Sequence, residues 1–241
     1  MSISTTTTSL TTLDPNFVIT TPRLRISHFI PTNIAHADLI LYVRHSPSSV
    51  KFQPSGPSLI PDRAAAQAFI ASGADRMVHT GYGRYAVSLR PEEASTISPA
   101  TSQTQSTLLS SDGPTPQPDK EDQSIYIGAI SCNLARYPDN PGPTVPDIGF
   151  NFLPAYHGRG YATEALFALM QYYRETKGCR AFAGITNPEN GEAKRLLARL
   201  GFQDRGVRGV SGVLPGGNVD ESSVWTLGVG EGEETLTAVR L

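Results

Sequence analysis

One segment constrains the fold more than any other: a strand-like run that leads through a glycine loop directly into a helix. Residues 147–153 (DIGFNFL) alternate between apolar and other side chains, as a half-buried strand does. The string PAYHGRG follows, and between Tyr161 and Thr176 apolar residues recur at helical spacing before Gly178 ends the helix. A strand joined to a helix by so short a loop predicts a domain that mixes α and β structure.

The loop between this strand and this helix has the features of an anion site. A helix N-terminus leaves four backbone N–H groups without partners in the helix, and the peptide dipoles place about half a positive charge there. Gly158 and Gly160 let the backbone approach a ligand closely, while Arg159 adds a cation and Thr163 a hydroxyl. The loop therefore suits phosphate or pyrophosphate. The alternative is an ordinary strand-to-helix turn, with Glu164 placed favourably in the helix dipole.

Two common phosphate-binding motifs do not fit this loop. The Walker string GxxxxGK[ST] does not occur in the sequence. The dinucleotide motif GxGxxG requires a third glycine where Thr163 stands, and a carboxylate at the end of the next strand. That strand, predicted over Arg180–Ile185, contains no acid. A dinucleotide enzyme is therefore a weaker alternative.

The remaining elements predict a mixed α/β domain rather than a regular repeat of strand–helix units. Helices are expected near 33–44, after Pro61–Asp62, and after a cap at Asn187–Asn190, whereas 46–60 is expected to be a loop. The other predicted strands cover residues 23–29, 85–89, 125–134, 202–213 and 222–227.

Two segments are too polar to form a core, which leaves one domain over residues 15–241. Residues 1–14 are rich in Ser and Thr, and residues 90–123 combine Ser, Thr, Gln and Pro with acidic side chains. We predict that the first segment is a disordered terminus and the second a disordered insertion within the domain.

Composition narrows the range of partners. The 20 Lys and Arg residues are balanced by 22 Asp and Glu residues and form no basic stripe, which argues against nucleic acid. No apolar run approaches 18 residues and the N-terminus does not resemble a signal peptide, so we expect a cytoplasmic protein without a membrane partner. Cys132 and Cys179 show no metal-binding spacing, so no metal is expected.

Three strings of this chain resemble motifs of the GNAT (GCN5-related) N-acetyltransferase superfamily. YHGRGYATEAL is similar to its cofactor loop, Gln/Arg-x-x-Gly-x-Gly/Ala, with Gly160 and Ala162 at the last two positions and His157 in place of Gln or Arg. NPENGEAKRLLARLGF resembles the next motif, an Asn-x-x-Ser/Ala helix that ends in Gly-Phe, and TPRLRISHF resembles the start of the RimJ/RimL-type branch. The resemblance implies the GNAT-type acyl-CoA N-acyltransferase fold, a mixed, mostly antiparallel sheet of six to seven strands flanked by about four helices.

The same resemblance implies how acetyl-CoA, the expected co-substrate, is bound. Backbone amides from Gly158 to Thr163 would hold its pyrophosphate, and the strand backbone at Asn151 and Phe152 would pair with its pantetheine arm. Asn190 would orient the pantetheine or the acetyl end, unless it serves only as a helix cap. His157 would donate to a phosphate, or be solvated. The implied cofactor-binding residues are Asn151, Phe152, His157, Gly158, Arg159, Gly160, Tyr161, Ala162, Thr163 and Asn190.

The implied reaction is direct attack of a primary amine on the thioester. An amine with the pKa of lysine, about 10.4, is almost fully protonated at pH 7, so a base is needed. Asp147 is our candidate base, with an ordinary strand-end turn residue as the alternative. Many relatives carry Tyr seven residues after the capping Asn, but Leu197 stands there, so the general acid remains open between Tyr156, Tyr161 and solvent.

The amine acceptor is expected between the first two helices, segment 46–60 and the loop 211–221. Asp220 and Glu221 in that loop would attract a cationic amine, or would simply be solvated. A protein N-terminus, a lysine and a small amine all fit this expectation, in a monomer or a homodimer. The alternative function is a non-catalytic domain that binds or senses acyl-CoA.

Overall fold

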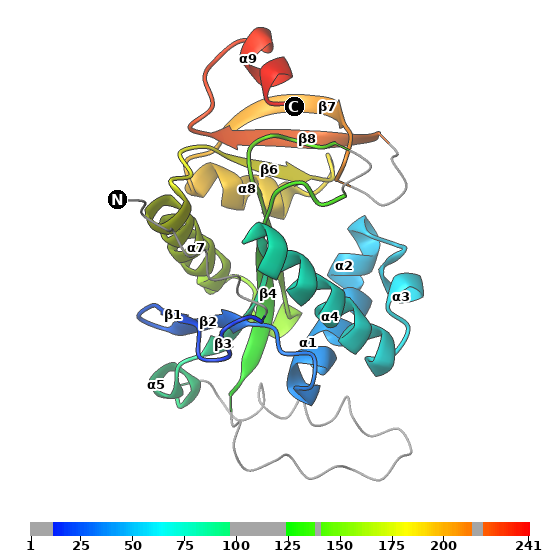
Figure 1. Ribbon diagram of the computed structural model, residues 1–241, viewed down its shortest axis with the longest axis vertical. Coiled ribbons are helices and arrows are strands. Elements are labelled where there is room, and N and C mark those ends of the chain that lie inside the picture. The colour runs from blue at the N-terminus through cyan, green and yellow to red at the C-terminus, as the bar shows by residue number, and fades with distance from the viewer. Residues whose placement is uncertain (1–11, 97–123, 138–140, 214–218) are drawn as a thin grey trace, which may run out of the picture.

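A computed structural model describes residues 12–96, 124–137, 141–213 and 219–241 (Figure 1). The strands in order are β1 (Val18–Thr20), β2 (Leu24–His28), β3 (Gly83–Leu89), β4 (Tyr126–Asn133), β5 (Asp147–Phe152), β6 (Phe182–Thr186), β7 (Gln203–Val210) and β8 (Asp220–Leu227). The longer helices are α1 (Ile34–His45), α4 (Arg63–Thr80), α7 (Tyr161–Lys177) and α8 (Gly191–Arg199). The shorter helical segments are α2 (Pro47–Phe52), α3 (Gly56–Leu59), α5 (Pro91–Ala94), the 3₁₀ turn η1 (Pro154–Tyr156) and α9 (Glu233–Ala238).

In the described part of the chain, eight strands form one sheet in the order β1-β2-β3-β4-β5-β6-β8-β7. Every neighbouring pair is antiparallel except β5 and β6, which are parallel. The predicted mixed, mostly antiparallel sheet is thus confirmed, with one strand more than expected. The additional strand is β1, whose three residues are too few to show a period in the sequence.

Helices cover both faces of the central strands (Figure 1). α1 and α4 pack on one face, where their apolar side chains meet Ala86 and Ala129. α7 packs on the other face and buries Leu166, Leu169 and Tyr173 against the strands. These α7 residues are spaced as the sequence predicts, so a single apolar stripe holds the helix, and its N-terminus, against the sheet.

The segment 46–60 is not the loop that was predicted, because it forms α2 and α3. Ser46 caps α2 by accepting a hydrogen bond from the Ser49 amide, and Pro47 occupies the first helical position. These are helix-start signals within a stretch whose Pro and Ser content suggests a turn. α9 near the C-terminus was also not predicted.

The boundaries of the two predicted disordered segments need correction. Leu13 packs partly against the core and the Asp14 carbonyl contacts the His28 ring, so order begins before residue 15. α5 lies within the predicted insertion 90–123. Residues 1–11 and 97–123 are outside the described residues, so disorder in them stays a prediction.

Candidate active site

The loop before α7 presents a row of backbone amides without partners. The first hydrogen bond into the helix runs from the Glu164 amide to the Gly160 carbonyl, 3.1 Å away. The amides of residues 158–163 find no acceptor within the described part of the chain. Residues 157–160 are exposed, so the amides at the start of this row face solvent. Six consecutive unpaired N–H groups at the start of a 17-residue helix form a site for an anion.

Glycine is required at two positions of this loop. Gly158 and Gly160 adopt φ angles of 72° and 80°, in the left-handed region that other residues rarely enter. A Cβ on Gly158 would meet nothing within 4 Å, and one on Gly160 would approach only the Arg23 guanidinium, at 3.5 Å. The surroundings of both glycines are therefore open, so a ligand can approach the backbone of the loop closely.

The turn between β1 and β2 holds this loop in place through Glu164. The Glu164 carboxylate accepts hydrogen bonds from the Thr21 hydroxyl at 2.6 Å, the Arg23 amide at 3.0 Å and Arg23 Nε at 2.7 Å. Arg23 also donates to the Arg159 carbonyl at 3.0 Å. Burial raises the pKa of Glu164, but these bonds outweigh it, and the net pKa lies below its ordinary value. Glu164 therefore anchors the loop, a role beyond the favourable helix-dipole contact expected from the sequence.

Tyr161 contributes to the loop only through its backbone. Its side chain is 2% exposed, lies under the Arg23 guanidinium and donates to Glu93 of α5 at 2.5 Å. Burial, together with this bond to a carboxylate, raises the pKa of Tyr161 to about 12. Tyr156 is 3% exposed, and burial raises its pKa as well. Neither phenol is placed to donate a proton to a thiolate at neutral pH.

β5 and β6 diverge beside the loop. Their parallel pairing consists of Asp147↔Ala183 and Ile148↔Gly184 and goes no further in the described chain. On its other side β5 remains paired with β4 as far as Gly128↔Phe152. One backbone edge of residues 149–152 thus faces an opening between the two strands, which can accept an extended ligand as an added strand.

Three of the predicted cofactor-binding side chains are engaged with the protein. The His157 Nε2 lies 2.8 Å from the Phe152 carbonyl, which can only accept, so this nitrogen carries the proton. Asn151 accepts from the Ser49 hydroxyl of α2 at 3.0 Å. Asn190 caps α8 by accepting from the Ala193 amide at 3.1 Å. Because β5 and β6 run parallel, Asn190, just after β6, lies at the same edge of the sheet as the loop.

Asp147 stands at the start of β5 and forms an ion pair with Arg136. Its side chain is 6% exposed, and both of its carboxylate oxygens accept from the Arg136 guanidinium. Arg136 also donates to the Val213 carbonyl, at 3.5 Å, and so connects β5 to the loop before β8. The side chains of Asp147 and Asn151 are on the sheet face that α1 and α4 cover, since residues two apart on a strand share a face.

Leu197 stands seven residues after Asn190, at the position where the family resemblance predicts a tyrosine. It is 1% exposed, and a Cβ on Gly184 would come within 2.5 Å of its side chain. The position is thus filled by core packing between α8 and β6, and it provides no proton donor.

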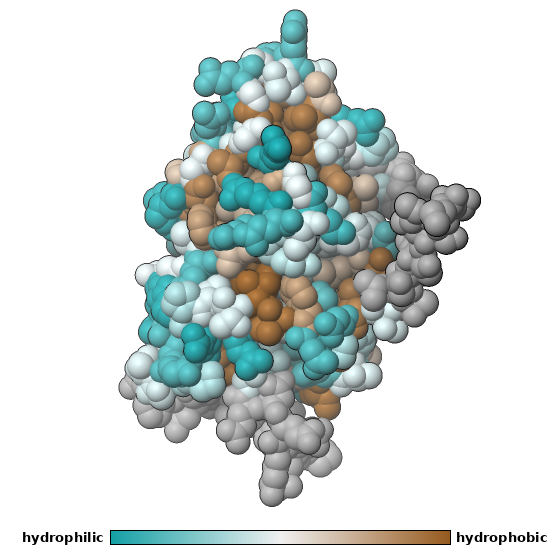
Figure 2. Space-filling model, turned by 60° about the vertical axis from the view of Figure 1, so that its left-hand side comes forward, coloured by the Kyte–Doolittle hydropathy of each residue, from teal (hydrophilic) through white to brown (hydrophobic). Residues whose placement is uncertain are grey.

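An open hollow borders the loop on its outer side. It has a volume of about 740 Å³ and is lined by Gly160 and Thr163, by the exposed face of α7, and by Thr20–Pro22. Phe167 of this lining is 56% exposed. Figure 2 brings the left-hand side of Figure 1 forward, and this face carries apolar patches among hydrophilic residues. The loop is thus reachable from solvent along α7.

Two negative findings apply to the described residues alone. They contain no group of three or more His, Cys, Asp or Glu side chains that could hold a metal ion. None of their helices is long and apolar enough to cross a membrane.

The sheet order, the diverging strands and the amide row define an acyl-CoA N-acyltransferase fold, and comparisons with known proteins agree. The family model described as an acetyltransferase (GNAT) domain matches residues 23–203. The chain belongs to this family, and its enzyme class is that of an acetyl-CoA-dependent N-acetyltransferase. No curated protein sequence matches the chain.

Solved structures share the fold at low sequence identity. An acetyltransferase from Agrobacterium tumefaciens is 17% identical with a TM-score of 0.56, covering 87% of this chain and 92% of its own. A Vibrio cholerae protein described as a ribosomal-protein-serine acetyltransferase is 18% identical with a TM-score of 0.61, covering 89% and 99%. RimL, a ribosomal L7/L12 α-N-protein acetyltransferase in complex with coenzyme A, is 14% identical with a TM-score of 0.59, covering 87% and 97%. These neighbours show that the chain shares their fold.

Proposed function

We propose that this chain transfers the acetyl group of acetyl-CoA to a primary amine by direct attack. The observation that carries the proposal is the row of unpaired amides at residues 158–163 beside the diverging ends of β5 and β6. A diphosphate fits the first feature and an extended pantetheine arm the second. RimL, which shares the fold, is named as an α-N-protein acetyltransferase, which supports an amine acceptor.

Acetyl-CoA would supply the activated acyl group as a thioester, and the protein would bind, orient and polarise it. The amides of residues 158–163 hold the phosphates, helped by the positive end of the α7 dipole. The open backbone edge of residues 149–152 aligns the arm, and an N–H of this edge stabilises the oxyanion. Binding both reactants side by side lowers the entropic part of the barrier.

We retain Asp147 as the candidate base. The ion pair with Arg136 uses one acceptor position on each carboxylate oxygen, and a carboxylate has about four such positions. A lone pair therefore remains for the proton of the amine, directly or through a water. The departing coenzyme A thiolate would take its proton from solvent, because Tyr156 and Tyr161 are buried and Leu197 has no proton to donate.

A thermal-shift series tests the binding part of the proposal. Acetyl-CoA should raise the melting temperature of the wild type, and Gly160→Asp should abolish this shift because it places a negative charge where phosphate binds. Gly178→Asp is the matched control: Gly178 ends the same helix with φ 67° and has nothing within 4 Å of a Cβ. The control should keep the shift.

Release of free thiol from acetyl-CoA over a panel of amines tests the transfer part. Turnover with any amine, lost in Gly160→Asp and kept in Gly178→Asp, supports the enzyme. Tight binding without thiol release across the panel would instead support a domain that only senses acyl-CoA.

A further inference from the structure

Four arginines gather on the sheet face that carries Asp147. Arg44 comes from the last turn of α1, Arg76 from α4, Arg84 from β3 and Arg136 from the segment after β4. Electrostatic repulsion from Arg44, Arg136 and Arg76 acts on Arg84, and Arg136 also repels Arg44. Four segments far apart in sequence thus bring like charges together, which is unfavourable unless an anion balances them.

The protein supplies only one carboxylate to these four cations within the described residues. Asp147 is the sole acid that acts on Arg84, and it is already paired with Arg136. Arg44 donates to the neutral Gln53, at 2.8 Å. Arg76 and Arg84 have no hydrogen-bonding or ionic partner for their side chains in the described part of the chain. The cluster therefore carries about three uncompensated positive charges.

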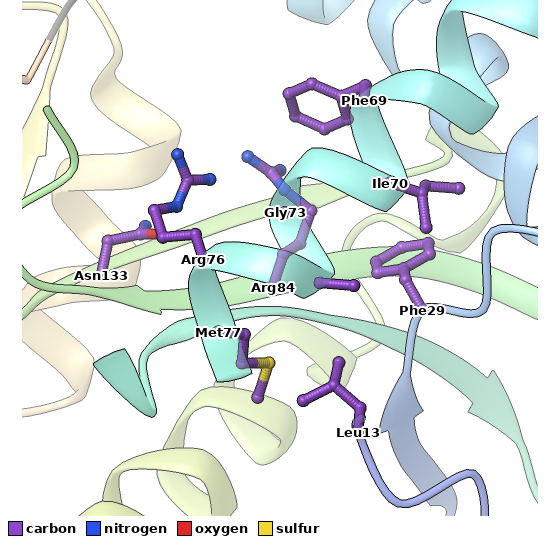
Figure 3. Close-up of a pocket in the computed structure, with 10 residues that line it drawn as sticks. Leu13, Phe29, Phe69, Ile70, Gly73, Arg76, Met77, Arg84 and Asn133 are labelled. Atoms are coloured by element: carbon purple, nitrogen blue, oxygen red, sulfur yellow. The ribbon is translucent and has the colours of Figure 1, made fainter. Parts of the chain in front are cut away.

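Arg84 is the central member of the cluster. It is half-buried in a strand, and its guanidinium lies 5.2 Å from the centre of the Phe69 ring, which Arg44 approaches to 5.5 Å. Burial, followed by repulsion from its neighbours, lowers the pKa of Arg84 to about 9, so it remains a cation at neutral pH. Figure 3 shows the guanidinium groups of Arg76 and Arg84 extending in the same direction, on the side where Phe69 lies.

The register places this cluster next to the opening between β5 and β6. Arg84 pairs with Ser131, and Ser131 pairs with Gly149, so the three residues form one row on the same sheet face. Two strand spacings separate Arg84 from Gly149, about 10 Å in total. A guanidinium at the end of its long side chain can cross much of that distance. An acceptor amine near Gly149 would thus have the arginines within reach of its other end.

We propose that the acceptor is a small amine carrying a carboxylate or phosphate group, and that Arg84, with Arg44 and Arg76, binds this oxyanion. This inference rests on the proposed function, because it describes the acceptor of the same site. The partly open cavity lined by Arg76 and Arg84 has a volume of only about 20 Å³, so the oxyanion lies at its mouth, not within it. Guanidinium groups favour such ligands through paired hydrogen bonds.

From the sequence, Asp220 and Glu221 were expected to attract a cationic amine. That is a preference for the opposite charge on the acceptor. Glu221 is exposed on β8, and the side chain of Asp220 lies outside the described set. Arg84 shares the row of Gly149, at the open edge of β5. An acceptor with both an amine and an oxyanion satisfies both sets of charges.

Paired acceptors test this proposal by turnover. Amino acids are compared with their amides, and phosphoethanolamine with ethanolamine, by thiol release from acetyl-CoA. The wild type should favour the anionic member in kcat/KM by on the order of tenfold to a hundredfold, mostly through KM. Arg84→Gln should remove most of that preference, and Arg84→Lys should keep part of it. Arg25→Gln, an exposed arginine of β2, is the control for net charge.

A binding measurement separates this proposal from the enzyme proposal. Inorganic phosphate is titrated calorimetrically into protein saturated with coenzyme A, which occupies the amide row. Arg84→Gln and Arg76→Gln should each weaken phosphate binding about tenfold or more, and Arg25→Gln should not. Turnover that favours neutral amines, or phosphate binding unchanged in both variants, would overturn the oxyanion site. Phosphate binding lost in both variants, without thiol release from any amine, would support the oxyanion site and contradict amine transfer.

Discussion

The proposed site has a cofactor half and an acceptor half, and the two are built in different ways. The cofactor half consists of backbone: consecutive amides at residues 158–163 and the open edge of β5, with side chains such as Glu164 acting as supports. The acceptor half consists of side chains, Asp147 and four arginines, from segments spread between α1 and β5. A backbone site depends on glycine and helix geometry, whereas a side-chain site depends on which residues the tertiary fold brings together.

This difference has a functional consequence. Amides recognise any phosphate in the same manner, which suits a co-substrate common to a whole family. Charged side chains can change independently of the backbone, so the acceptor half is where substrate preference can vary on one fold. Substitutions should therefore separate into those that alter acetyl-CoA binding and those that alter the acceptor.

The largest effect is expected for Asp147→Asn in the acceptor half. The substitution leaves Arg136 without its carboxylate, near Arg44 and Arg84. We expect the free energy of unfolding to fall by about 3–5 kcal/mol, the usual cost of an uncompensated buried charge. Urea denaturation measures the loss. At temperatures where the variant is folded, acetyl-CoA binding should be retained.

The control for Asp147→Asn is Glu233→Gln. Glu233 likewise accepts hydrogen bonds from two nitrogens of one arginine, Arg208, but its side chain is 74% exposed. Solvent screens such a pair, so the control should unfold almost like the wild type. Equal losses in the two variants would contradict the buried character of the acceptor half.

A smaller effect is expected for Glu164→Gln in the cofactor half. The substitution removes the ion pair with Arg23 but keeps an oxygen that accepts from Thr21. We expect a loss of about 1–2 kcal/mol, reduced because the Arg23 side chain is 35% exposed. Acetyl-CoA affinity, measured by calorimetry, should weaken while preference among acceptors stays unchanged. A shift in acceptor preference would break the separation between the two halves. Glu175→Gln, further along α7, is the control.

The pH dependence of the unfolding free energy of the wild type and of Glu164→Gln tests the anchoring role of Glu164 further. The folded state holds the pKa of Glu164 below its ordinary value of 4.5. Its contribution to stability is therefore fully present above pH 4.5 and is lost as pH falls through the lowered pKa. The difference in unfolding free energy between wild type and Glu164→Gln should be constant near neutral pH and shrink under acid. A difference that grows as pH falls would have the wrong sign for this carboxylate.

The strand, loop and helix of the proposed cofactor half are predicted well from the sequence, because their signals are local. One strand, two glycines and an apolar stripe lie within about 30 consecutive residues, and the structure places them as strand, loop and helix. The role of Glu164 was only partly foreseen, since its partners Thr21 and Arg23 lie about 140 residues away. The string TPRLR contained the signal, but no spacing rule connects it to the loop.

The acceptor half is largely unpredictable from the sequence. Arg84 stands in a short strand, GRYAVSL, and a charge there is the one local sign that the strand faces something other than core. Its proximity to Arg44, Arg76 and Arg136 follows from the sheet order and the packing of α1 and α4, which sequence periodicity does not fix. For the same reason, Asp147 was recognised as a candidate but its ion pair was not.

The smallest effect is expected for His157→Ala. The His157 Nε2 donates to the Phe152 carbonyl at 2.8 Å, which connects the end of β5 to the start of the loop. Because the histidine is exposed, losing this bond should cost about 0.5–1 kcal/mol and weaken acetyl-CoA about twofold to fivefold. His79→Ala is the control, since His79 is also exposed and contacts a backbone carbonyl at 2.7 Å, but within α4. Calorimetry at low and high salt gives the decisive comparison. A larger loss that salt reduces would show that His157 binds the phosphate itself, and the cofactor half would then depend on a side chain as well as on backbone.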